Sequence, residues 1–198
     1  MNESSIKIGV LAIQGDFAAH KKMLERMGVK TVEVRNADQL AEVDGLIMPG
    51  GESTTMLKFL VEENLWKPIS QYSQTGKPIF GTCAGAILLA REVKNPPQPS
   101  LNLIDIAIER NSYGRQVDSF ITKVETRFTD NAIEAVFIRA PKIQAIGQEV
   151  DVLATLENQP IFVRQNNVFA ATFHPELTND DRIHRLFIQS LGRSLKSL

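Results

Sequence analysis

The chain contains a single cysteine, and the residues around it are typical of a nucleophile. Cys83 stands in the stretch Gly81-Thr82-Cys83-Ala84-Gly85, between an apolar run and a helix-forming run. This order is the form of a nucleophile elbow, a sharp strand-to-helix turn that strains the central residue and requires glycine at its flanks. At a helix N-terminus the helix dipole favours the thiolate. On the motif alone, a buried and inert core cysteine is an equally good interpretation.

A base for such a thiol is best sought at His174, which ends the apolar run NVFAATF and is followed by proline and Glu176. Proline moves the preceding residue out of the helical region, and an extended segment puts His174 and Glu176 on the same side of the chain. The carboxylate can then orient the imidazole toward a thiol, as in a catalytic triad. The alternative is a strand-end turn with two exposed polar residues. His20 and His184 lie among charged residues in helical patterns, and we expect both on solvated helix faces.

A third motif is the glycine-rich turn MPGGEST, residues 48–54, directly after the apolar strand pattern GLI. Two glycines permit positive φ and let backbone N–H groups point into a cleft. Such a turn can supply an oxyanion hole, with a second donor from the N–H of Ala84. The alternatives are an ordinary strand–helix turn capped by Ser53, or a phosphate loop. The Lys-Ser/Thr pair of a Walker motif does not follow the turn.

The elements that must position these motifs alternate in the first half of the chain. The second half begins with the proline-rich stretch NPPQPS, continues with short β-type runs and closes with a helical pattern over residues 180–195. These patterns predict an α/β fold: one mostly parallel sheet with an antiparallel extension and helices on both faces. Strands are expected at 6–15, 30–34, 44–51 and 77–83, and helices at 17–28, 53–65 and 84–92.

The glycine turn, Cys83 and His174 each come directly after an apolar strand pattern. The carboxyl ends of parallel strands meet at one edge of a sheet, where open α/β folds place their sites. We therefore expect the three motifs to lie together.

Composition excludes several classes of function. The 22 Lys and Arg residues balance 23 Asp and Glu residues, so nothing indicates nucleic acid or an anionic membrane as a partner. One cysteine forms no internal disulfide, and the polar N-terminus lacks the features of a signal peptide, so we expect a cytoplasmic protein. Apolar runs of membrane-spanning length are absent from the sequence, and so are Cys/His clusters at metal-ligand spacing.

Together these motifs resemble the class I, triad-type glutamine amidotransferases. More narrowly, the chain is similar to the glutaminase subunits of bacterial-type pyridoxal 5′-phosphate synthases over nearly its whole length. The most specific segment is ERNSYGRQVDSF, residues 109–120, because sister glutaminases lack it. The start of the chain and NPPQPS match less well, and we expect neither to touch the site residues. The resemblance also rests on residues 48–54, 81–85, 137–141 and 173–177.

The resemblance implies one flavodoxin-like amidotransferase domain over residues 1–198, which hydrolyses L-glutamine without a metal or organic cofactor. It implies that Cys83 is the nucleophile, His174 the general base and acid, and Glu176 the residue that orients the histidine. The oxyanion hole would be formed by Gly51 and Ala84. The residues implied to hold glutamine are Gly51, Glu52, Ser53, Arg110, Ile138 and Arg139; from spacing alone, surface salt bridges are the simpler interpretation of the two arginines.

The resemblance further implies a partner, because one glutaminase-sized domain accounts for the whole sequence. The partner would be a (β/α)8-barrel synthase subunit that uses the ammonia to make pyridoxal 5′-phosphate, in an assembly of twelve subunits of each kind. Three alternatives stay open: the glutaminase of another synthase, such as imidazole glycerol phosphate synthase; an α/β-hydrolase-like thiol esterase; and a non-enzymatic thiol-bearing binding or stress module.

Overall fold

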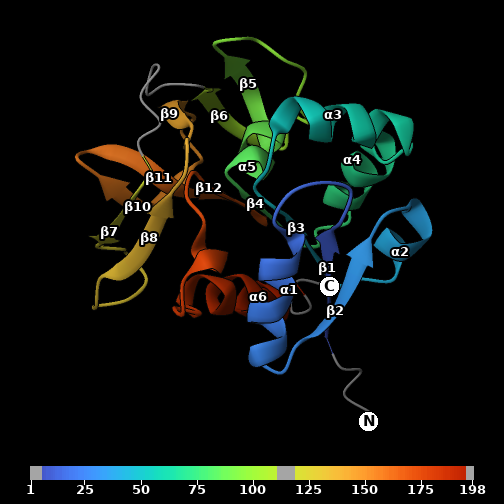
Figure 1. Cartoon of the computed structure of the whole chain (residues 1–198), viewed down its shortest axis with the longest axis horizontal. Helices are drawn as coiled ribbons and strands as arrows, with labels where there is room; N and C mark the ends of the chain where they lie inside the picture. The colour runs from blue at the N-terminus through green and yellow to red at the C-terminus, as the bar shows by residue number, and fades with distance from the viewer. Residues whose placement is uncertain (1–5, 111–118, 195–198) are drawn as a thin grey trace.

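The structure is a computed structural model and describes residues 6–110 and 119–194. Its centre is a seven-stranded sheet in the order β10-β11-β12-β4-β3-β1-β2 (Figure 1). The strands from β12 to β2 pair in parallel, and β11 and β10 extend the sheet with antiparallel pairs. The predicted fold class is therefore confirmed, and the order β2-β1-β3-β4-β12 follows the flavodoxin-like pattern. The strands are β1 (Lys7–Leu11), β2 (Lys30–Val34), β3 (Gly45–Met48), β4 (Ile79–Thr82), β10 (Asp151–Leu156), β11 (Gln159–Gln165) and β12 (Val168–Ala171).

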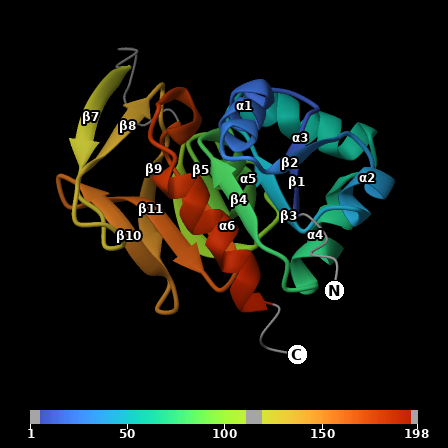
Figure 2. The ribbon, with the colours of Figure 1, turned by 90° about the horizontal axis from the view of Figure 1, so that it is seen from below.

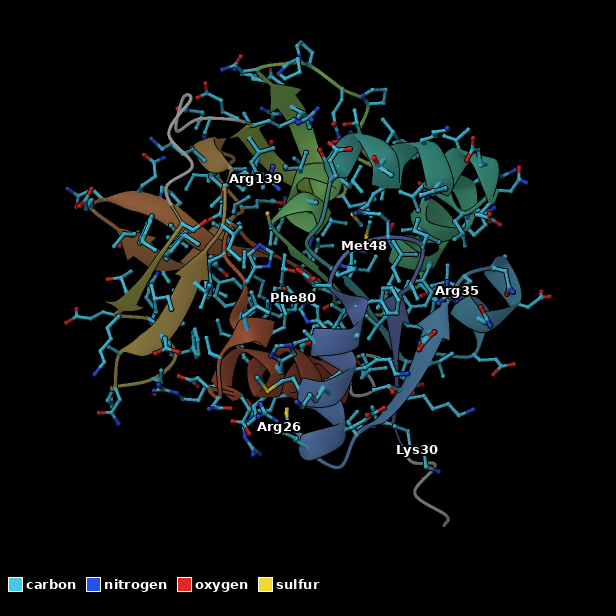
Figure 3. The ribbon with its side chains drawn as sticks, viewed as in Figure 1. Arg26, Lys30, Arg35, Met48, Phe80 and Arg139 are labelled. Carbon is cyan, nitrogen blue, oxygen red and sulfur yellow. The ribbon has the colours of Figure 1, made fainter. Side chains whose placement is uncertain are left out.

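The central strands are apolar on both faces because both faces are covered. Alternate side chains along a strand point to opposite faces, so each strand contributes to two separate hydrophobic clusters. Met48 packs into one cluster, and Phe80 packs into the other. Figure 3 shows the two side chains on opposite faces of the central strands. This double coverage is the physical reason that these strands read as continuous apolar runs rather than alternating ones.

Two groups of helices cover the sheet. One face carries α1 (Phe17–Arg26) and α6 (Arg182–Ser194), which contribute Leu24, Phe187 and Leu191 to the cluster around Phe80. Figure 2 is viewed from this side and shows α6 in front of the central strands. The other face is covered by α2 (Ala37–Ala41), α3 (Ser53–Glu62), α4 (Trp66–Gln74) and α5 (Ala84–Leu89).

The second half of the chain differs in part from the sequence prediction. The helix expected over residues 84–92 ends at Leu89, because residues from Ala90 onward pair with another strand. Several of the predicted short β runs do not join the central sheet and instead form two small sheets. One small sheet contains β5 (Ala90–Lys94), β6 (Ile104–Glu109) and β9 (Lys142–Ile146); the other contains β7 (Phe120–Val124) and β8 (Ile133–Phe137).

Strand β4 pairs in parallel with β3 on one side and with β12 on the other. The prediction that the three motifs lie together depends on this arrangement. Their carboxyl ends therefore open on one edge of the sheet, followed by the glycine turn, Cys83 and His174 respectively. Among the residues that the structure describes, no helix has both the length and the apolar character needed to cross a bilayer.

Candidate active site

Cys83 occupies a strained turn between β4 and α5. Its backbone has φ 47° and ψ −104°, a region that side-chain-bearing residues rarely adopt. The Cys83 N–H donates to the carbonyl of Ala171 at 2.8 Å, which ties the turn to β12. The flanking glycines are sterically required: a Cβ on Gly81 would lie 2.6 Å from the backbone carbon of Gly85, and one on Gly85 would lie 2.0 Å from the Met48 carbonyl oxygen. The turn thus has the backbone conformation expected of an elbow.

His174 and Glu176 form a buried pair at the end of β12. His174 Nδ1 lies 2.7 Å from Glu176 Oε1, and both side chains are almost fully buried. The N–H of His174 donates to the carbonyl of Val136 at 2.8 Å, which fixes the backbone that carries the ring. The predicted extended segment is wrong in detail: Pro175–Leu177 forms a 3₁₀ turn, η1, which begins at the proline and brings the carboxylate back to the ring. The alternative of two exposed polar residues is also wrong.

The environment of His174 favours the protonated ring. Burial lowers the pKa of His174, but the hydrogen bonds with the Cys83 thiol and with Glu176 outweigh burial and raise the pKa from 6.5 to about 10. Burial alone would raise the pKa of Glu176; the neighbouring rings of His20 and His174 lower it instead. Because Glu176 occupies Nδ1, the Nε2 atom remains for the thiol. This arrangement places an imidazolium beside the side chain of the candidate nucleophile.

The glycine turn after β3 is held by the loop that follows β1. Gly51 has φ 157°, and a Cβ there would lie 2.4 Å from the Gln14 side-chain oxygen. That oxygen accepts the N–H of Glu52 at 3.1 Å, and the N–H of Asp16 donates to the Gly50 carbonyl at 3.0 Å. A side chain at Gly51 would therefore push the two loops apart.

The cap of α3 is Glu52 rather than the predicted Ser53, which is the first helical residue. The Glu52 carboxylate accepts the N–H groups of Thr54 and Thr55 at 3.2 and 2.7 Å, and it also accepts both hydroxyls. Burial raises the pKa of Glu52, but these hydrogen bonds outweigh it and lower the pKa from 4.5 to about 2. A second carboxylate oxygen makes the longer Glu side chain a complete cap for two orphan donors at once.

A pocket of about 350 Å³ opens between these elements. Its size suits a small polar metabolite. Glu176 lies behind His174, and Ala84 is buried directly after Cys83. Arg139, labelled in Figure 3, is held at φ 44° beside Ile138. The pocket is lined by Gln14, Gly15, Asp16, Gly51, Glu52, Ser53, Cys83, Ile87, Arg110, Ile138, Arg139, Pro141 and His174.

Gln98 corrects the expectation that the NPPQPS stretch does not touch the site residues. Its side-chain oxygen accepts from Arg110 Nη1 at 2.5 Å and from the Ser53 hydroxyl at 3.1 Å. The side-chain nitrogen of Gln98 is buried without a hydrogen-bond partner among the described residues. Arg110 also lies 3.6 Å from a Glu52 oxygen. Residues 111–118, most of the family-specific segment, lie outside the described residues.

The expectation for His20 and His184 was wrong. Both side chains are fully buried rather than solvated, because they pair with each other across α1 and α6. A signal was present in the sequence: His20 shares the buried stripe of Met23, three residues on, and His184 shares that of Phe187. Charged neighbours on the opposite helix faces obscured it.

Within residues 6–110 and 119–194, one group of side chains has atoms close enough to hold a metal ion. Oxygen or nitrogen atoms of Asp16, His174 and Glu176 lie within 4.8 Å of one another. The 2.7 Å hydrogen bond between the last two explains their closeness without a cation.

Comparison with known proteins agrees with this geometry. Residues 10–193 match the model of a family described as the SNO glutamine amidotransferase family. A relative from Thermosipho africanus, named pyridoxal 5′-phosphate synthase subunit PdxT, is 54% identical; the match covers 95% of this chain and 100% of the relative. The protein of the same name from Thermotoga maritima is 48% identical, with 93% and 98% covered.

Two solved structures extend the comparison. A crystal structure described as a glutamine amidotransferase superposes with a TM-score of 0.89 and 45% identity, covering 93% of this chain and 98% of that one. A chain from the structure of PurLQS from Thermotoga maritima superposes with a TM-score of 0.69 at 18% identity, covering 96% of this chain and 97% of that one. The second likeness concerns the fold alone.

Proposed function

Because the chain belongs to the SNO glutamine amidotransferase family, we propose that it hydrolyses L-glutamine to L-glutamate and ammonia as the glutaminase subunit of a pyridoxal 5′-phosphate synthase. The observation that carries the proposal is the 2.7 Å hydrogen bond of His174 to Glu176 beside Cys83, at the edge of one polar pocket. The name that the curated relatives share supports the choice of synthase.

In the proposed reaction Cys83 gives its thiol proton to His174, and its sulfur attacks the side-chain carboxamide carbon of glutamine. The negative charge on the carbonyl oxygen is held by the backbone N–H groups of Gly51 and Ala84, each lowering the barrier by about 3 kcal/mol. His174 gives its proton to the departing ammonia as the C–N bond breaks, which leaves a glutamyl thioester on Cys83. His174 then takes a proton from water, the hydroxide attacks the thioester, and glutamate leaves as the thiol is restored. Glu176 keeps the ring oriented throughout.

The rest of the pocket holds the substrate. Arg110 offers paired planar donors that suit the α-carboxylate of glutamine, and Ser53 adds a hydroxyl. Gly51, Glu52, Ile138 and Arg139 also line the pocket. No metal or organic cofactor takes part in the proposed chemistry.

The ammonia requires an acceptor on another chain. We propose that the partner is a (β/α)8-barrel synthase subunit, with twelve copies of each subunit in the assembly, and that residues 1–198 form a single amidotransferase domain. Support for the barrel and for the stoichiometry comes from the sequence resemblance. The proposed location is the cytoplasm.

The test is mass spectrometry of the full chain after treatment with an electrophilic glutamine analogue, with and without a candidate synthase subunit. We expect one adduct, on Cys83, and none in a Cys83→Ala variant. A His174→Ala variant should lose the adduct as well, because its thiol is not activated. Labelling of other residues, or hydrolysis of esters but not of glutamine, would contradict the proposal.

A further inference from the structure

The three histidines of the chain lie in one connected group with Glu176, although they come from separate elements. His20 on α1 is fully buried, and its Nε2 lies 3.3 Å from Glu176 Oε2. The same Nε2 lies 3.1 Å from the hydroxyl oxygen of Thr82, the residue before Cys83. The other ring nitrogen, Nδ1, lies 3.0 Å from His184 Nε2 on α6. His20 thus contacts the neighbour of the nucleophile and the carboxylate at the same time.

The contact with His20 matters for Glu176 because, in the part of the chain that the structure describes, only one of its two carboxylate oxygens has a hydrogen bond. Oε1 is bound to His174, whereas Oε2 is buried and has no hydrogen bond of ordinary geometry among the described residues. An uncompensated carboxylate oxygen in the interior costs free energy and leaves the carboxylate free to rotate. The His20 ring is the group that lies against this oxygen.

The carboxylate decides where the protons of the buried histidines lie. An ionised carboxylate only accepts, so the His20 nitrogen beside it carries the hydrogen. The His20 Nδ1 is then an acceptor, and His184 donates its Nε2–H to it. This leaves His184 Nδ1 without a hydrogen, in agreement with its having no hydrogen-bond partner within the described part of the chain. Burial lowers the pKa of both rings, His184 to about 3, so both are neutral.

From these contacts we propose that His20 is a positioning residue of the glutaminase reaction: its Nε2–H is hydrogen-bonded to the Thr82 hydroxyl oxygen and lies 3.3 Å from Glu176 Oε2, where it restrains this oxygen electrostatically, and Glu176 thereby keeps His174 aimed at Cys83. The inference rests on the proposed function. His184 serves it by holding the His20 proton on Nε2. Neither His20 nor His184 lines the pocket, so their effect passes through Glu176.

The test compares His20→Phe, which keeps an aromatic ring but removes the donor, with His20→Gln, which keeps an N–H donor. Glutamine hydrolysis is measured on the full chain together with a candidate synthase subunit. We expect His20→Phe to lower kcat about 10- to 100-fold, by analogy with the outer hydrogen-bond partners of metal-binding histidines, with KM changed less than about twofold. His20→Gln should recover most of kcat. Ser190→Ala, which removes a buried hydroxyl on α6, is the control and should leave kcat unchanged.

A second readout does not depend on glutamine. The rate of Cys83 alkylation by iodoacetamide is measured at mildly acidic and at alkaline pH. Because the His174 ring is hydrogen-bonded to the Cys83 thiol, a displaced ring should change the ratio of the two rates in His20→Phe, and His20→Gln should restore the wild-type ratio. If the wild-type chain hydrolyses no glutamine, the proposed function fails, while the alkylation ratio still decides the role of His20.

Two outcomes would overturn the inference: a folded His20→Phe protein with wild-type kcat and alkylation ratio, or a His20→Gln protein as impaired as His20→Phe. If His20→Phe does not fold, variants of His184 test the proposal instead. His184→Phe removes the donor that fixes the His20 proton and should lower kcat, whereas His184→Gln keeps an N–H donor and should not. Equal effects of these two variants would refute the proposal.

Discussion

The ring of His174 rests directly against the backbone of Gly50. A Cβ on Gly50 would lie 2.3 Å from His174 Cε1 and 2.9 Å from His174 Nδ1, closer than a Cβ atom comes to other heavy atoms in proteins. The glycine turn therefore contributes more than backbone donors: its first glycine is the surface against which the imidazole is placed.

We expect Gly50→Ala to lower kcat about 100-fold, because displacing a reacting group by about 1 Å costs a rate factor of that size. The measurement is glutamine hydrolysis, with thermal unfolding to verify the fold. Gly192→Ala on α6 is the matched control, since a Cβ there meets no atom within 4 Å. This variant should keep full activity and gain about 0.5–1 kcal/mol of stability. Unchanged kcat in a folded Gly50→Ala protein would contradict the steric argument.

The raised pKa of His174 predicts the alkaline limit of activity. The ring must be protonated to release ammonia, so kcat/KM should fall as pH rises through about 10. Glu176→Gln removes one of the groups that raise this pKa, so the alkaline limb should move to lower pH and kcat should drop by at least about 100-fold. Glu33→Gln, which affects only a surface ion pair with Lys21 and Arg35, should leave the profile unchanged. An unmoved limb in Glu176→Gln would be evidence against this account.

The lowered pKa of Glu52 predicts that part of the free energy of unfolding depends on pH. Its pKa is lowered from 4.5 to about 2 on folding, so its contribution is fully present above 4.5 and is lost as pH falls toward 2. The side chain is 52% exposed, and solvent screening limits the contribution to about 1 kcal/mol, typical of an N-cap. Glu52→Gln should therefore be less stable than wild type at neutral pH and nearly equal to it at about pH 2. Denaturant unfolding at the two pH values measures this; a constant difference would refute it.

Gln98 predicts an effect on substrate binding. Its oxygen holds both Arg110 and Ser53, so Gln98→Leu should raise KM for glutamine about 10-fold with a smaller change in kcat, as expected for one lost hydrogen bond to a charged group. Gln165→Leu is the control, because Gln165 also accepts through its side-chain oxygen but does so from the Asp105 N–H, away from the pocket. A lower KM in Gln98→Leu would mean that Gln98 competes with glutamine for these donors.

Much of the fold and the location of the candidate site could be predicted from the sequence, because both depend on local patterns. Apolar runs separated by helical patterns indicate a parallel sheet, and glycines at fixed positions around Cys83 indicate a turn that only glycine permits. The three motifs follow strands, and strand ends gather at a sheet edge whatever the details of packing. These features required no knowledge of long-range contacts.

What only the tertiary structure decided is the set of polar side chains that support the site. His20 and His184 are 164 residues apart, and each supplies one hydrogen-bond partner that the other needs in the interior. Gln98 lies in a proline-rich stretch without periodicity. It reaches Arg110 and Ser53 because the loop between β5 and β6 carries its side chain to them. Sequence patterns report which face of an element is apolar. They do not report which polar group finds a partner across the core, because that partner is chosen by the three-dimensional approach of distant elements.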